Sequence, residues 1–182
     1  MEILIERTNV TSDAIDGTLC IDGQYVCDVV ENVHVALPAG RYLIVRHYCK
    51  QYERFMPYVE VDSHSLPDKC SCCGKLEDVN LNKVMPCICP MLKPGNGVHH
   101  RKDGSIILGT RIIPGCLIHP LDVFAPLAER VRKAIKRGAE ITLVLTDGPC
   151  CSVQNVDGLM RISSAKNNNT NELVVTQKDI IL

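Results

Sequence analysis

The sequence predicts an α+β domain, in which a mostly antiparallel β-sheet or small barrel is covered by one main helix and carries a cysteine-rich insertion. Three observations lead to this fold class. Residues 1–62 consist of β-rich runs separated by turn signals, and residues 120–138 have the apolar period of a helix. Between these two parts, five of the eleven cysteines fall within twenty residues.

The first part of the chain is rich in the apolar and β-branched residues that favour strands. An Asp-Gly pair at Asp22 and Gly23, a frequent hairpin turn, separates two of its runs, and a Pro-Ala-Gly turn at 38–40 precedes the next. No helical period occurs here, so these runs are expected to form strands. The predicted strands cover residues 3–8, 18–21, 24–30, 41–48 and 58–62.

The second part predicts a strand, one helix and a last strand. Residues 105–113 and 140–146 are β-rich, and the latter run is expected to return into the first sheet. Pro120 lies near the first turn of the predicted helix, and Gly138 is a stop signal. Pro126 is expected either to kink this helix or to mark its true start. Apolar residues recur at steps of three and four at Leu121, Phe124, Leu127, Ala128, Val131 and Ile135.

These elements predict one domain over residues 1–151. Residues 63–97 change in character, with cysteines and prolines but little apolar period, and are interpreted as an insertion in the β scaffold. Residues 152–182 are expected to form a weakly structured tail, because their centre is polar and turn-prone. Within the tail, residues 174–182 could add an edge strand.

Charge and hydropathy exclude several classes of protein. The chain carries 20 Lys and Arg against 21 Asp and Glu, so we expect neither nucleic acid nor a membrane surface as its partner. No apolar run is long enough for a transmembrane helix, and the first residues lack the features of a secretory signal, which predicts a cytoplasmic protein. No glycine-rich phosphate loop is present, so nucleotide-dependent chemistry has no support.

The cysteine cluster predicts a structural zinc site. An odd number of cysteines in a chain without a secretory signal disfavours a disulfide framework. A C-x2-C pair is followed, after thirteen residues, by a C-x-C pair, and four thiolates on two short knuckles suit tetrahedral zinc. The predicted ligands are Cys70, Cys73, Cys87 and Cys89.

Other arrangements of this cluster remain open. Cys72 competes with Cys73 as a ligand, and His64 or His99 could replace Cys89. A reduced, cysteine-rich loop without metal is the alternative to the whole site. If zinc is bound, its role is to order a segment that has little hydrophobic core of its own.

The segment from residue 95 to 120 is the candidate for nucleophilic chemistry. His100 and Cys116 lie sixteen positions apart, and a cysteine nucleophile needs a histidine beside it and backbone N–H groups for the oxyanion. This spacing resembles the signature of the L,D-transpeptidases, with Arg101 in place of the glycine that follows their histidine. The resemblance implies Cys116 as the nucleophile and His100 or His99 as the base. The matching residues are Gly109, Gly115, Cys116 and Leu117.

A second resemblance covers about residues 2–145. The chain is similar, in the same order, to a family of small bacterial and phage proteins known as domain of unknown function 5675, which look like remote relatives of the transpeptidase fold. Val98 and His99 match the family's Ile-His pair, and Ser105 takes the place of its cysteine, which implies Ser105 as the nucleophile. The insertion resembles a subgroup from gut bacteria and their mobile elements. The matching segments are ILIERT, GTLCIDGQYVCDVVE, LPAGRYLIV, GVHHRKDGSIILG, FAPLAERVRKAI and EITLVL.

Two functions follow from these residues, and whether the protein is an enzyme stays open. In the first, Cys116 attacks a peptide or peptidoglycan-like amide, His100 or His99 is the base, and backbone N–H groups around Gly115 and Cys116 stabilise the oxyanion. Asp103 or His119 would orient the histidine. Cell-wall substrates would require export by phage lysis or a secretion system. In the second, the protein is a non-catalytic, zinc-stabilised binding or structural module of a phage or mobile element.

Overall fold

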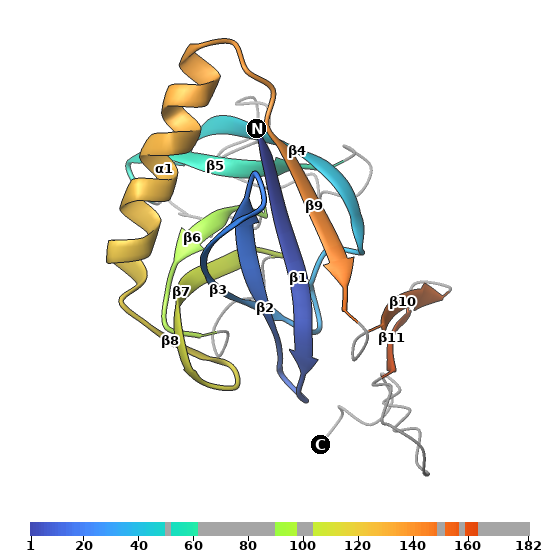
Figure 1. Cartoon of the computed structure of the whole chain (residues 1–182). Helices are drawn as coiled ribbons and strands as arrows, with labels where there is room; N and C mark the ends of the chain where they lie inside the picture. Colours follow the sequence, from blue (N-terminus) through green and yellow to red (C-terminus); the bar gives the residue numbers. More distant parts are fainter. Residues whose placement is uncertain (50–51, 62–89, 98–103, 149–151, 157–158, 164–182) are drawn as a thin grey trace, which may run out of the picture.

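The computed structural model describes residues 1–49, 52–61, 90–97, 104–148, 152–156 and 159–163. In these residues the chain forms a barrel-like sheet with one helix beside it (Figure 1). The elements are β1 (Glu2–Val10), β2 (Ala14–Ile21), β3 (Gln24–Asn32), β4 (Gly40–Cys49), β5 (Arg54–Glu60), β6 (Leu92–Pro94), β7 (Ile106–Ile113), β8 (Cys116–Ile118), α1 (Pro120–Lys136), β9 (Thr142–Asp147), β10 (Ser152–Val156) and β11 (Leu159–Ser163).

The sheet is mostly antiparallel and almost closes on itself. Its strand order is β5-β4-β9-β1-β2-β3-β7-β6, and β8 pairs with β7 outside this path. Only the pairs β1–β9 and β6–β7 are parallel among the described strands. The two ends of the order meet where Tyr58 bridges Met91 and the Val59 N–H donates to the Pro90 carbonyl at 3.0 Å. The predicted fold class, an α+β small barrel with one covering helix, is therefore confirmed.

The β2–β3 hairpin forms where the sequence places its turn signal. Asp22 and Gly23 have φ values of 50° and 80°, the left-handed pair that a two-residue hairpin turn requires. The Asp22 carboxylate also accepts a hydrogen bond from the Glu2 N–H at 3.0 Å. This contact joins the hairpin turn to the start of β1.

One hydrophobic core fills the space between the sheet and α1. Alternate residues of the strands point into it, as the period of a half-buried strand dictates. The helix contributes residues spaced by three and four, which form one apolar stripe. Buried members include Ile3, Ile5, Leu19, Val29, Ile106, Leu108, Leu143 and Leu145 of the sheet, and Phe124, Leu127, Val131 and Ala134 of α1.

The helix begins at Pro120, directly after His119 with its left-handed φ of 50°. Pro126 lies inside the helix, so the alternative in which it marks the start is wrong. Proline fits the first turn because the N–H it lacks would have no helical acceptor there. At the other end Gly138 has a φ of 73°, and the Ala139 N–H donates to the Ala134 carbonyl, which confirms Gly138 as the stop.

Two boundaries differ from the prediction. The expected insertion over residues 63–97 extends too far, because Met91 and Leu92 are fully buried and β6 pairs with β7. In the expected tail, β10 and β11 pair as an antiparallel hairpin of their own sheet. The sequence has an Asp-Gly dipeptide, a frequent hairpin turn, between these two strands. In the described part of the chain, no helix has the length and apolar character needed to cross a membrane.

Candidate functional site

Cys116 begins the three-residue strand β8, directly after a tight turn. Gly115 has a φ of 75°, a conformation that glycine adopts without strain. Cys116 is partly exposed, whereas Cys27 and Cys49 are buried. Cys116 is therefore less buried than Cys27 and Cys49.

Two buried carboxylates hold the β7–β8 hairpin against the barrel. Asp16 of β2 accepts a hydrogen bond from the Gly115 N–H at 2.8 Å, and Asp28 of β3 accepts one from the Arg111 N–H at 2.8 Å. The Arg111 guanidinium also lies 3.5 Å from Asp28. The Gly115 N–H is thus committed to a carboxylate, and its predicted role as an oxyanion donor is incompatible with this arrangement.

A small apolar cluster lies beneath β8, separate from the main core. Gly109 of β7 allows the close approach, because a Cβ there would lie 2.8 Å from both the Ile118 carbonyl oxygen and the Leu117 Cβ. The cluster anchors β8 by apolar burial, in addition to the two carboxylates. Its members are Ala14, Val30, Ile107 and Leu117.

A short segment before the histidines pairs with β8. The backbone of Gly97 bridges that of Cys116. Asn96 reinforces the contact: its carbonyl accepts from the Leu117 N–H, and its side-chain amide donates to the Leu117 carbonyl, both at 2.9 Å. Gly97 precedes His99 by two residues. His99 and His100 themselves lie outside the described residues, so their distance from Cys116 stays a prediction.

Ser105, the other candidate nucleophile, lies just before β7 and is only 2% exposed. Its Oγ accepts a hydrogen bond from the Met91 N–H at 3.3 Å. Lys93 of β6 is also buried and lies opposite Ile107 in the parallel register. Because Ile107 is two residues after Ser105, Lys93 and Ser105 are on the same face of the sheet. Through this hydrogen bond Ser105 joins the chain before β7 to the chain before β6. Ser105 is therefore more buried than Cys116, which is partly exposed.

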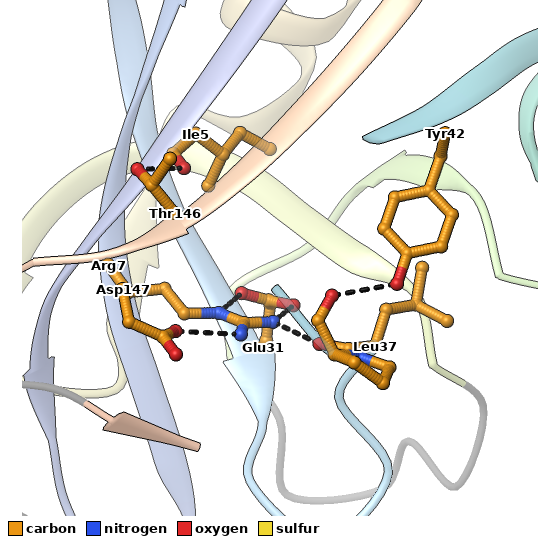
Figure 2. A network of polar contacts seen from close by, with 8 residues as sticks. Ile5, Arg7, Glu31, Leu37, Tyr42, Thr146 and Asp147 are labelled. Atoms are coloured by element: carbon orange, nitrogen blue, oxygen red, sulfur yellow. Dashed lines mark hydrogen bonds and ion pairs between the residues drawn. The ribbon is translucent and has the colours of Figure 1, made fainter. Parts of the chain in front are cut away.

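A buried ionic network, which was not predicted from the sequence, lies at one end of the barrel (Figure 2). Arg7 of β1 is fully buried and donates two hydrogen bonds to the Glu31 carboxylate, each at 2.8 Å. A third nitrogen donates to Asp147 at 3.0 Å, and the guanidinium also donates to the Leu37 carbonyl. The two carboxylates raise the pKa of Arg7 against the opposing effect of burial.

This network fixes the chain around the Pro38 turn. The Tyr42 hydroxyl donates to the Pro38 carbonyl at 2.7 Å, next to the Leu37 carbonyl that Arg7 holds (Figure 2). Arg7, Glu31 and Asp147 come from β1, β3 and β9, so one cation links three strands and a loop. The signal in the sequence was a charged residue within or directly after each of three β-rich runs, but the pairing of these charges cannot be identified from the sequence alone.

The predicted zinc ligands Cys70, Cys73, Cys87 and Cys89 lie outside the described residues. Within the described parts of the chain, no three or more His, Cys, Asp or Glu side chains gather as a metal site would require. The zinc site therefore stays a prediction about the cysteine-rich segment.

Comparison with known proteins found no matching family model, no matching curated protein and no matching solved structure. The chain's own geometry therefore defines its class, an α+β barrel with a partly exposed cysteine on an anchored hairpin.

Proposed function

We propose that the protein transfers or hydrolyses an acyl group at a peptide or peptidoglycan-like amide, with Cys116 as nucleophile and His99 or His100 as base. The observation that carries this proposal is the bridge between Gly97 and Cys116. It joins the strand of the thiol to backbone that precedes His99 by two residues. A short stretch of chain would then bring an imidazole to the sulfur, as a cysteine nucleophile requires.

The reaction would have two steps. The histidine accepts the thiol proton, the Cys116 sulfur bonds to the amide carbon, and negative charge develops on the carbonyl oxygen. The C–N bond then breaks, the protonated histidine gives its proton to the leaving amine, and a thioester remains. Water or a second amine attacks the thioester, passes a proton to the histidine, and releases the product and the thiol. Because Asp16 holds the Gly115 N–H, the oxyanion needs a different donor.

A non-catalytic binding or structural module of a phage or mobile element is the second candidate. The observation that favours it is that the polar groups of both candidate nucleophile positions already serve the fold: Asp16 engages the Gly115 N–H beside Cys116, and Ser105 is buried and bonded to Met91. In this function Cys70, Cys73, Cys87 and Cys89 of the insertion bind zinc and order a protein-interaction surface. The proposed kinship with domain of unknown function 5675 fits both candidates, because a fold alone does not determine an activity.

Alkylation of individual cysteines tests the enzyme proposal. The full chain is treated with iodoacetamide between pH 5 and 9, and mass spectrometry of its peptides follows each thiol. Cys20 is the matched control, because it is also a partly exposed, free cysteine. An activated Cys116 should react at least about tenfold faster than Cys20 at neutral pH. His99→Gln and His100→Gln, each measured separately, should identify the base, because this difference should be lost in only one of the two variants.

Equal rates for Cys116 and Cys20, unchanged in both histidine variants, would refute the activated thiol.

Zinc content then tests the second candidate. Protein purified without chelator should hold about one zinc ion per chain, and Cys73→Ser with Cys87→Ser should remove it. Less than about half an equivalent of zinc would count against the metal site.

A further inference from the structure

A groove separates the β4–β5 hairpin from one flank of α1, with a volume of about 370 Å³. Its helix side is formed in part by Ala125 and Ala128, whose short side chains leave the space unfilled. Tyr48 and Phe55 line the hairpin side and are 45% and 51% exposed. We name this feature the hairpin groove.

The aromatic side of the hairpin groove is ordered by ring contacts. Tyr48 and Phe55 face each other across β4 and β5, with their ring centroids 5.4 Å apart in an edge-to-face arrangement. The Arg46 guanidinium lies 3.8 Å from the centre of the Phe55 ring. This cation–π contact holds the arginine over the groove but leaves its N–H groups able to bind an anion.

The three arginines of the groove differ in their partners. Arg132 of α1 is occupied by Glu129, which accepts two hydrogen bonds from it at 2.5 and 2.6 Å. This contact lowers the pKa of Glu129 to about 2, so the carboxylate is ionised at physiological pH. The positive charge of Arg132 then balances the negative charge of Glu129. Among the described residues, Arg46 and Arg54 make no ion pair; Arg54 donates only to the Tyr52 carbonyl.

We propose that the hairpin groove binds an acidic peptide segment, whose carboxylates pair with Arg46 and Arg54 while a neighbouring apolar side chain packs on Phe55. Guanidinium groups match carboxylates in geometry, so Arg46 and Arg54 suit acidic side chains. The exposed aromatic pair adds an apolar surface against which an apolar side chain of the peptide can pack. The occupant is a peptide rather than a nucleic acid because Glu53 also lines the groove. A phosphate backbone would meet this carboxylate, whereas a peptide can place its few charges away from it.

This site shares no residue with the β7–β8 hairpin that carries Cys116. Failure of the acyl-transfer proposal would therefore leave the groove proposal intact, and the reverse also holds.

Fluorescence anisotropy tests the proposal with the full chain. The probe is a fluorescein-labelled hexapeptide, Gly-Glu-Leu-Glu-Leu-Gly, and its control has glutamine at both glutamate positions. Arg46→Gln and Arg54→Gln should each raise the Kd for the acidic peptide by about five- to tenfold, as loss of a charge-assisted hydrogen bond does. Arg41→Gln is the matched control, since Arg41 also lies on exposed β4 but pairs with Glu2, outside the groove.

The expected result is that Arg41→Gln changes the Kd less than about twofold and the glutamine peptide binds at least about tenfold more weakly. Equal binding of the two peptides, or equal losses in all three arginine variants, would overturn the proposal. Tighter binding of a labelled oligothymidine, lost in Arg46→Gln, would also overturn it and assign the groove to single-stranded nucleic acid.

Discussion

Replacement of Arg7 by methionine should destabilise the barrel strongly while preserving most of the side-chain volume. The change removes the cation from between Glu31, whose side chain is 1% exposed, and Asp147, whose side chain is 17% exposed. It also leaves the Leu37 carbonyl without its Arg7 donor. Two carboxylates would then share one end of the barrel without the charge that neutralises them.

The expected loss is about 3–5 kcal/mol of unfolding free energy, the usual cost of removing one partner of a buried ion pair. Because Asp147 keeps some contact with solvent, we expect a value near the lower end of that range. In a chain of this size each kcal/mol corresponds to about 2–4 °C, so Tm should fall by about 6–12 °C. The loss can be measured by urea titration followed by far-ultraviolet circular dichroism, and Tm by a thermal scan.

Arg41→Met is the matched control, because the Arg41–Glu2 pair is exposed at 66% and 53%. It should cost no more than about 1 kcal/mol. A second variant, Arg7→Met with Glu31→Leu, should recover part of the loss, since an apolar pair leaves one buried charge fewer. A loss below about 1 kcal/mol for Arg7→Met, or no recovery in the double variant, would falsify the claim that the network stabilises the fold.

Two further predictions concern buried groups of β2 and β3. Asp16→Ala should cost about 1–3 kcal/mol and speed amide exchange at Gly115, because that N–H loses its acceptor, whereas Asp16→Asn should retain most of the protection. Equal exchange in both variants would contradict this. Burial, with the charge of Asp28 adding to it, raises the pKa of Cys27 from 9.0 to about 12. The neutral thiol is thus favoured in the folded state, so its stability contribution is complete below pH 9 and is lost as pH rises towards 12. Cys27→Ala should flatten the decline in urea-measured stability between pH 9 and 10.5, and an unchanged slope would exclude Cys27 as its cause.

The local elements of the fold were predictable because their signals are local. The turn at Asp22 and Gly23 and the end of α1 at Gly138 follow from backbone conformations that few residues adopt. The parallel pairing of β1 with β9 was not predictable, since it joins Ile3 to Leu143 with no signal in either run. The three-residue strand β6 was missed because a strand so short shows no period within a cysteine-rich stretch.

The candidate site was predictable only as a set of residue types. The Gly-Cys step singled out Cys116, and the structure places it, partly exposed, on the β7–β8 hairpin. The burial of Ser105 could not be foreseen, because it depends on β6 pairing with β7 beside it. The roles of Asp16 and Asp28 were equally hidden. Asp28 is a polar residue in a predicted strand and Asp16 lies just before one, and only the folded hairpin shows which N–H each binds.

The anchoring of β8 sets a condition that any chemistry at Cys116 must meet. The Asp16 carboxylate fixes the turn before Cys116, which gives the thiol the defined position that a nucleophile needs. The same contact uses the Gly115 N–H and places negative charge near the site, where it would oppose both a thiolate and an oxyanion. Catalysis would therefore require positive charge or N–H donors from a segment that contacts β8, and the bridge at Gly97 leads directly into the His99–His100 stretch. If those histidines supply neither charge nor base, the anchored hairpin functions as a rigid binding surface.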